Sequence, residues 1–138
     1  MRLEGKRKRT GAILALELLF VFPIMMAIFF GTVEFGLLLA AEARLMNASR
    51  EGTRVAAAGG SFADVQAAVK AALPTAEQNL VDINAKLFDV MSNPLLPGDP
   101  VSVMVSAKAT VLVPDYLRFI CFSISGKCLI GQTVMRKE

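Results

Sequence analysis

The chain has 138 residues, 54% of them apolar, and its mean hydropathy of +0.54 is too high for a typical soluble domain, where about half of the residues are apolar with glycine included. In the first ten residues, five Lys and Arg against one Glu give a charge of +4, so the net charge of +3 leaves −1 on the rest of the chain. A basic cluster limited to a leader beside an apolar run is typical of a membrane protein and argues against a nucleic-acid-binding face.

Catalytic chemistry has little support in this composition. The chain has no His, which is the commonest general base and the commonest metal ligand. The Ser, Asp and Glu residues form no nucleophile elbow, metal-ligand spacing or glycine-rich phosphate loop. We therefore expect a protein that is not an enzyme and that has no cofactor and no metal.

A long apolar run follows the basic leader, residues 1–11. Residues 18–33 contain no charged side chain, and the helical pattern extends over residues 12–41. Such a helix is about 45 Å long, whereas the hydrocarbon core of a membrane is about 30 Å thick. Three interpretations are open: a removable secretory signal, a permanent anchor, or the helix of a pilin-like subunit. The apolar region is much longer than signal peptides use, which disfavours the first, although residues 41–43 read Ala-Glu-Ala.

Two features inside the run bear on how it packs. Pro23 removes one backbone hydrogen bond and is expected to kink the helix without ending it. Ala27 and Gly31 are small residues four apart, a spacing that lets another helix approach closely in lipid. We therefore regard them as candidate assembly residues.

The helix is expected to continue over residues 42–58, because an apolar stripe of small residues persists and Gly59 and Gly60 then provide a C-terminal cap. A second, amphipathic helix is expected over 61–73, with Ser61 and Asp64 at capping-box spacing.

Beyond that helix the apolar period changes to two. Strands are expected at about 80–90, 101–113 and 129–136, separated by loops rich in Pro, Gly, Asn and Asp. Three strands with one apolar face, covered by the second helix and the lower half of the long one, predict an α+β head over residues 42–138 with an antiparallel sheet.

The two cysteines, Cys121 and Cys128, lie in the part that the membrane topology places outside the cytoplasm. We favour a disulfide between them, since the intervening Ser125, Gly126 and Lys127 can form a turn, and free buried thiols are the alternative.

Two carboxylates border the apolar run. Glu17 is costly at membrane depth, so it either reaches headgroup water or has a partner. Glu34 is expected at the far interface of the span or paired with a cation such as an Arg of another subunit. Both are candidate assembly residues.

Several segments, taken together, resemble one known family. They are the basic run up to Gly11-Ala12, Leu16-Glu17-Leu18, Pro23, Gly31-Thr32-Val33-Glu34-Phe35-Gly36, Asn47-Ala48-Ser49-Arg50-Glu51-Gly52-Thr53-Arg54 and Val134-Met135-Arg136-Lys137-Glu138. In this combination they resemble the TadE-like minor pilins, or pseudopilins, of tight-adherence (Tad/Flp) type IV pilus systems. The resemblance is close over about residues 5–58, and beyond them it concerns only the layout.

The resemblance implies a prepilin peptidase substrate cut at Gly11 and Ala12. In such precursors the Glu is usually the fifth residue after the cut, whereas a cut after Gly11 makes Glu17 the sixth. A cut after Gly11, a cut after Ala12 and no cut at all therefore stay open. If cleavage occurs, the new amino terminus of one subunit can be neutralised by Glu17 of a neighbour shifted along the axis.

The expected function is that of a structural minor pilin-like subunit, assembled through its N-terminal helix into a tight-adherence pilus or its initiating complex, which supports adhesion or secretion. The implied partners are other pilin subunits, inner-membrane platform proteins and the prepilin peptidase, with no nucleic acid. The expected location is the inner membrane, single-pass, with a cytoplasmic N-terminus and an extracytoplasmic head that can enter an extracellular pilus. The alternative is an unprocessed, membrane-anchored binding module of the cell envelope.

Overall fold

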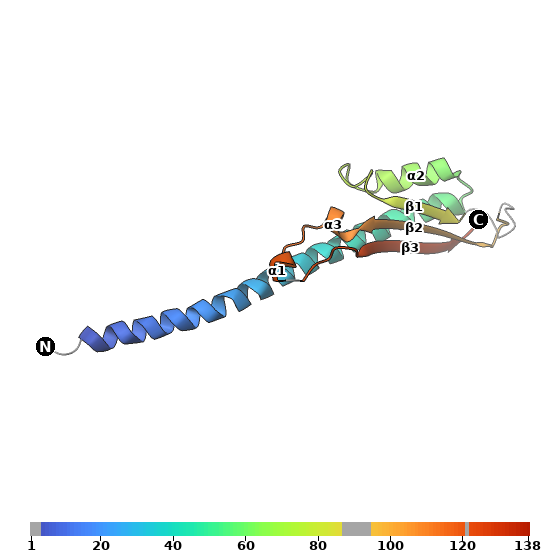
Figure 1. The fold of residues 1–138 in the computed structure, drawn as a ribbon. Coiled ribbons are helices and arrows are strands. Elements are labelled where there is room, and N and C mark those ends of the chain that lie inside the picture. Colours follow the sequence, from blue (N-terminus) through green and yellow to red (C-terminus); the bar gives the residue numbers. More distant parts are fainter. Residues whose placement is uncertain (1–3, 87–94, 121) are drawn as a thin grey trace.

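A computed structural model describes residues 4–86, 95–120 and 122–138 of the chain. Helix α1 (Glu4–Ala57) runs the length of the molecule, and every other element lies beside its C-terminal half, forming a head (Figure 1). The last part of the strand expected at 80–90 and Cys121 lie outside the described residues. The expectation of an α+β chain with a long N-terminal apolar helix, a second helix and a three-stranded antiparallel sheet is confirmed.

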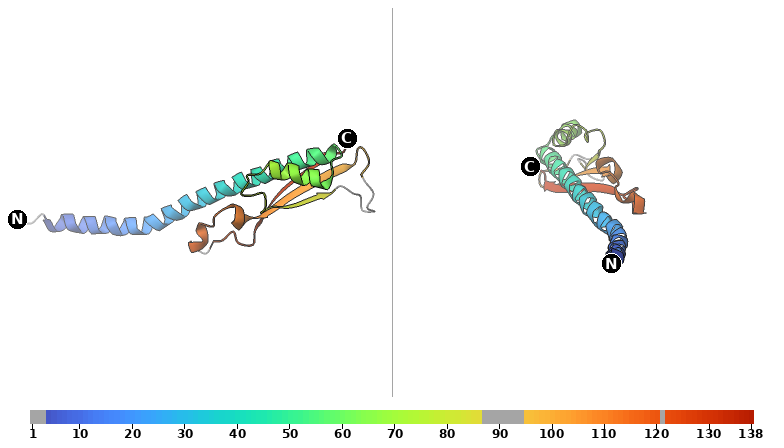
Figure 2. Two further views of the ribbon diagram at one scale, coloured as in Figure 1. Left: turned by 90° about the horizontal axis from the view of Figure 1, so that it is seen from above. Right: turned by 90° about the vertical axis from the view of Figure 1, so that its left-hand side faces the viewer.

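Helix α1 continues through Pro23, and Figure 2 shows a bend in its N-terminal, blue part. A bend there is expected, because proline removes a backbone hydrogen bond and its ring clashes with the preceding turn. The helix ends at the predicted glycines: Gly59, with a φ of 85°, donates from its N–H to the Ala56 carbonyl, and the Gly60 N–H donates to the Val55 carbonyl. This pair of bonds is a Schellman cap, and glycine adopts the left-handed conformation that it needs without strain.

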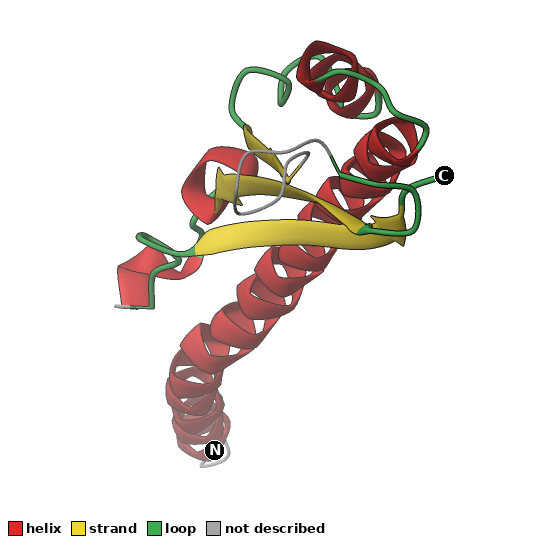
Figure 3. Ribbon diagram, turned by 90° about the vertical axis from the view of Figure 1, so that its right-hand side faces the viewer, coloured by secondary structure: helices red, strands yellow, loops and turns green. Residues whose placement is uncertain are grey.

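Helix α2 (Phe62–Ala71) begins with the predicted capping box. The Ser61 hydroxyl accepts from the Asp64 N–H at 3.3 Å, and the Asp64 carboxylate accepts from the Ser61 N–H at 2.9 Å. Hydrogen bonds from the Ser61 side chain and backbone hold the pKa of Asp64 below its ordinary value of 3.8. The apolar face of α2 carries the buried Val65 and Val69, which reach α1 at Gly52. Figure 3 shows α2 beside the C-terminal end of α1.

The sheet consists of β1 (Asp82–Lys86), β2 (Pro100–Lys108) and β3 (Cys128–Arg136), antiparallel and in that order. The central strand β2 alternates as predicted, since Val101, Val103, Val105 and Ala107 are buried while Ser102, Met104 and Ser106 are only partly covered. The buried side forms one core cluster with Leu45 and Ala48 of α1 and the valines of α2.

The strand expected to reach Val113 ends at Lys108, where α3 (Ala109–Leu112) begins. The cause is loss of strand partners: β1 pairs only as far as Ser106, and Lys108 pairs with Cys128, the first residue of β3. The backbone groups beyond Lys108 bond differently, because the Ala109 N–H donates to the Lys127 carbonyl and the Val113 N–H to the Ala109 carbonyl. The alternation of Ala109, Val111 and Val113 was therefore not a strand signal.

The turn at α3 builds a second, smaller core cluster. Ala109 and Val113 pack with Ile124 on Ala41 of α1, and all four are at most 6% exposed. A short 3₁₀ helix, η1 (Leu117–Ile120), follows and is the part of the head nearest to the N-terminal half of α1 (Figure 1). The head therefore follows α1 from Ala57 back to the middle of the helix.

Candidate assembly stem and its junction with the head

The N-terminal part of α1 has no cover from the chain itself. None of residues 14–29, named here the exposed half of α1, is buried. Its exposed large apolar side chains are Leu14, Leu16, Leu18, Leu19, Phe20, Val21, Phe22, Ile24, Met25, Ile28 and Phe29. Among the described residues, α1 is the one helix long and apolar enough to cross a membrane. So large an apolar surface in water is unfavourable, and it marks a surface that lipid or protein covers.

The predicted processing and register residues lie in or before this half. Gly11 and Ala12 are in α1, which begins at Glu4 and so extends through the leader; side chains are described from Leu14 onward. Glu17 is exposed and has no hydrogen bond or ion pair with the part of the chain that the structure describes. Its carboxylate is therefore accessible to a group from outside the chain.

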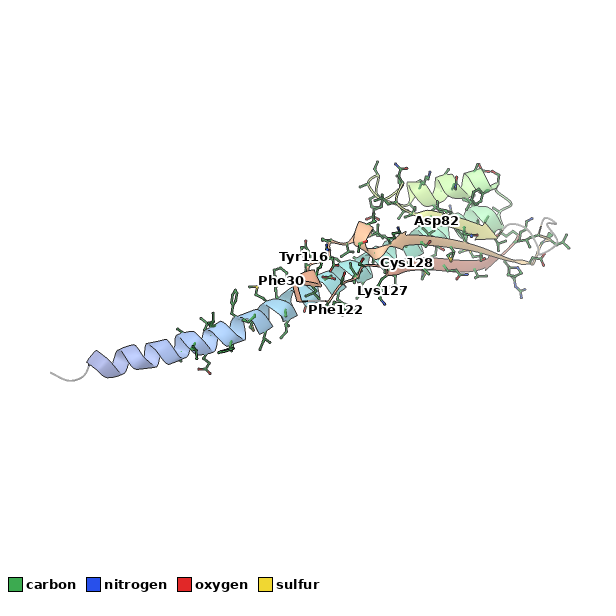
Figure 4. The ribbon with its side chains drawn as sticks, viewed as in Figure 1. Phe30, Asp82, Tyr116, Phe122, Lys127 and Cys128 are labelled. Atoms are coloured by element: carbon green, nitrogen blue, oxygen red, sulfur yellow. The ribbon has the colours of Figure 1, made fainter. Side chains whose placement is uncertain are left out.

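The head meets α1 at residues 30–34, named here the junction. The rings of Phe30 and Tyr116 stack with centroids 6.0 Å apart and planes at 29° (Figure 4). Gly31 packs against η1, since a Cβ built on it would be in van der Waals contact with Leu117 Cδ1, at 3.7 Å. One of the two small residues expected to receive another helix thus lies against the chain's own head, whereas Ala27 stays in the exposed half.

Glu34 is buried at the junction, with 2% of its surface exposed. Its Oε2 accepts a hydrogen bond of 2.9 Å from the Leu117 N–H, and Oε1 is buried without a hydrogen-bond partner among the described residues. The sequence suggested an interfacial carboxylate or a pair with another subunit, and nothing in it indicated a contact with residue 117, which is 83 positions away. In this arrangement Glu34 joins η1 to α1, because an N–H at the start of a helix has no partner inside that helix.

The C-terminal part of α1, residues 41–57, is named here the head half. Its buried side consists of Leu45 and small residues, and two of the small residues carry hydroxyls, one bonded across the core to β2 and one bonded within α1. The Ser49 hydroxyl donates to the Val103 carbonyl at 2.7 Å, and the Thr53 hydroxyl donates to the Ser49 carbonyl at 2.7 Å. Within the segment Asn47 to Arg54, the buried positions are Ala48, Ser49, Gly52 and Thr53, and the exposed ones are Asn47, Arg50, Glu51 and Arg54. The segment is therefore an amphipathic docking face for the head.

Two glycines let the backbones come this close. A Cβ on Gly131 of β3 would lie 2.5 to 2.6 Å from the backbone of Leu45 and Met46. A Cβ on Gly52 would lie 2.5 Å from Val69 Cγ2. Sequence reasoning named Gly52 within the segment Asn47 to Arg54 but missed Gly131. The one available signal for Gly131 is its position inside a strand, where glycine often marks a close approach of another backbone.

The predicted disulfide residues, Cys121 and Cys128, are not part of the junction. Cys128 is exposed at the start of β3, and since Cys121 lies outside the described residues, the disulfide stays a prediction (Figure 4). Within the described ranges no group of three or more His, Cys, Asp or Glu side chains is placed to hold a metal ion. The candidate site is therefore the surface of α1, which is uncovered over residues 14–29 and carries the head from the junction onward.

Comparison with known proteins places the strongest likeness on this same helix. Residues 12–54 match the model of a protein family described as TadE-like protein. No curated protein and no solved structure matches the chain. The matched segment runs from the predicted cleavage junction through the exposed half and the junction into the head half, and it confirms the resemblance that the sequence indicates.

Proposed function

We propose that the chain is a minor pilin-like subunit of a tight-adherence pilus system, inserted in the inner membrane with its N-terminus in the cytoplasm and its head outside. A prepilin peptidase removes the basic leader, and the subunit then joins the pilus or its initiating complex through α1, in support of adhesion or secretion. Its partners in this proposal are other pilin subunits and the inner-membrane platform proteins. The TadE-like segment at residues 12–54 supports this proposal.

The observation that carries the proposal is the contrast between a folded head and an apolar helix that the head leaves uncovered. Residues 14–29 are apolar almost all round, and a helix that is hydrophobic on every side is stable in lipid or among other helices. A pilin-like subunit meets both surroundings in turn, first in the membrane and then in the assembly. A soluble monomeric binding protein rarely exposes so large an apolar surface.

Glu17 supplies the register of assembly in this proposal. Its carboxylate is exposed and lacks a partner in the described chain, as an acceptor for a group on a neighbouring subunit should. A cut after Gly11 creates a positive amine on Ala12, and residues five apart on one helix are separated by about 7.5 Å of rise and do not stack as residues four apart do. The amine of an adjacent subunit, shifted along the axis, can reach it.

Intact mass of the membrane-extracted protein tests the processing step. Expression with a prepilin peptidase should remove residues 1–11 or 1–12, and expression without it should leave the full chain. A full-length chain under both conditions would contradict the proposal and favour the unprocessed anchored module of the cell envelope.

The assembly step is tested by Glu17→Gln, with Glu42→Gln as the matched control, because Glu42 is also an exposed glutamate of α1 but lies beyond the junction. The Glu17→Gln chain should still insert in the membrane and should no longer enter a complex with other pilus subunits, while the control should do both. Normal incorporation of Glu17→Gln in a pull-down would refute the role of Glu17.

A further inference from the structure

We propose that the end of the head nearest to the exposed half of α1 docks on the anionic phospholipid surface of the membrane that α1 spans. This surface, named here the head base, consists of Tyr116, Arg118, Phe122 and Lys127. The inference rests on the membrane span of the proposed function and adds a second contact with the bilayer, made by the head itself.

The length of the uncovered helix places the head base at the membrane surface. The hydrocarbon core is about 30 Å thick, which is about 20 residues of helix. A span that begins after the basic leader, at about Ala12, therefore ends at about Gly31. The head first contacts α1 there: Tyr116 stacks on Phe30, and Leu117 lies next to Gly31. Tyr116 and η1 therefore lie level with the headgroups, and Lys127, at the start of β3, lies farther along α1 (Figure 4).

The aromatic side chains of the head base suit that depth. Tyr116 is 42% exposed and stacks on Phe30, and Phe122 is 61% exposed (Figure 4). One exposed Phe on a soluble surface needs no explanation, but here it lies at the same end of the head as the only tyrosine of the chain (Figure 4). Aromatic residues gather at membrane interfaces because their rings are apolar and, in Tyr, one end is polar.

The charges of the head base are arranged with the anions inward and the cations outward. Glu34 is buried, and Asp115 accepts from the Ser123 hydroxyl while its other carboxylate oxygen is buried. Asp115 is half-buried, whereas Arg118 and Lys127 are exposed, so the exposed charges of the head base are positive, which complements an anionic lipid surface.

Single tryptophans provide the test, because the natural chain contains none. Three variants of the full chain are placed in nanodiscs that contain phosphatidylglycerol: Phe122→Trp at the head base, Phe22→Trp in the exposed half and Phe62→Trp at the start of α2. All three positions are exposed, at 61%, 57% and 43%, so none of the substitutions disturbs a core. Lipids with a nitroxide near the headgroup or deep in the acyl chain then quench the fluorescence according to depth.

The expected result is strong quenching of Phe122→Trp by the shallow label, quenching of Phe22→Trp by the deep label, and little quenching of Phe62→Trp by either. If Phe22→Trp is quenched while Phe122→Trp behaves like Phe62→Trp, the docking of the head is wrong and the membrane span stands. If Phe22→Trp is not quenched either, the span of the proposed function is wrong as well.

The charge argument has its own test in the Phe122→Trp background. Arg118→Gln should lower the ratio of docked to undocked heads by about fivefold in anionic nanodiscs, the effect of one basic residue near such a surface, and Lys127→Gln should lower it less, because Lys127 lies farther from the lipid. Lys70→Gln, on α2 and away from the head base, is the matched control and should leave the ratio unchanged. Shallow quenching that is the same in zwitterionic and anionic nanodiscs would overturn the choice of an anionic partner.

Discussion

The two halves of α1 differ in what covers them, although one uninterrupted helix contains both. In the exposed half, residues 14–29, large apolar side chains point outward and none of the residues is buried. In the head half, residues 41–57, the buried side consists of Leu45 and otherwise of small residues such as Ala48 and Gly52, which let a sheet and a second helix approach closely. Total hydrophobicity alone therefore does not say which half forms the core; side-chain size and the presence of a polar face do.

This contrast explains why a family likeness can be confined to the helix. The matched segment, residues 12–54, holds both the apolar surface that the head leaves uncovered and the face on which the head folds. The small and hydroxyl residues at the end of that segment set the distance between helix and sheet.

The largest effect on stability is expected for a substitution where the head packs on α1. Gly131→Ala places a Cβ 2.5 Å from backbone atoms of Leu45, which cannot move as a side chain can. We expect a loss of about 3 kcal/mol in the free energy of unfolding, the upper part of the range for overpacked cores. Denaturation of the detergent-solubilised chain measures it, and Gly36→Ala, with nothing within 4 Å of its Cβ, is the control that should lose no stability. Equal stability of the two variants would show that β3 does not pack on α1 in this way.

A charge introduced in the exposed half should affect membrane insertion and not the stability of the head. Ile24→Arg, at a position that is 62% exposed, should leave the unfolding of the head unchanged and oppose membrane insertion by about 2.5 to 3.5 kcal/mol. Asn47→Arg, at an exposed position of the head half, should affect neither property. A glycosylation-based insertion assay beside a melting curve reads both, and loss of head stability in Ile24→Arg would mean that the exposed half has a folding role.

The junction is predicted to respond less strongly. Glu34→Ala leaves the Leu117 N–H without its acceptor, a loss of about 1 to 3 kcal/mol for a buried group, while Glu34→Gln retains an oxygen at the same place. Hydrogen exchange at the Leu117 amide should therefore accelerate in Glu34→Ala and stay slow in Glu34→Gln. Fast exchange already in the natural chain would indicate that η1 does not rest on α1.

The smallest effect concerns pH and the start of α2. Because the bonds from Ser61 lower the pKa of Asp64 in the folded chain, this group stabilises the fold above its ordinary pKa, and the contribution is lost as the pH falls through the lowered value. The natural chain should therefore be more stable than Asp64→Asn at neutral pH, and the difference should shrink in acid. Melting temperatures of the natural chain and of Asp64→Asn, at neutral pH and in acid, measure this difference in stability. A difference that is independent of pH would assign the effect to the capping geometry alone.

Sequence reasoning found most of the elements and few of the contacts. The kinked long helix, the glycine cap, the capping box at Ser61 and the alternation of β2 follow from local chemistry, which a sequence displays directly. The end of β2 at Lys108 depends on where its neighbours stop, and the approach of Leu117 to Glu34 joins residues 83 positions apart. Neither the end of β2 nor the contact between Leu117 and Glu34 produces a periodic pattern in the sequence, because the side chains involved are common at helix ends and in loops. Glu17 was singled out because a charge in an apolar run is costly, a signal that needs no partner to be seen.

Removal of residues 1–29 tests the division of α1 most directly. The shortened chain retains Phe30, Gly31 and Glu34, and since no residue of the exposed half is buried against the head, we predict a folded head whose melting temperature matches that of the full chain. It should also be absent from the membrane fraction after a high-salt wash, which releases any electrostatic contact of the head base. An unfolded head, or a shortened chain that stays with the membrane through that wash, would contradict the account.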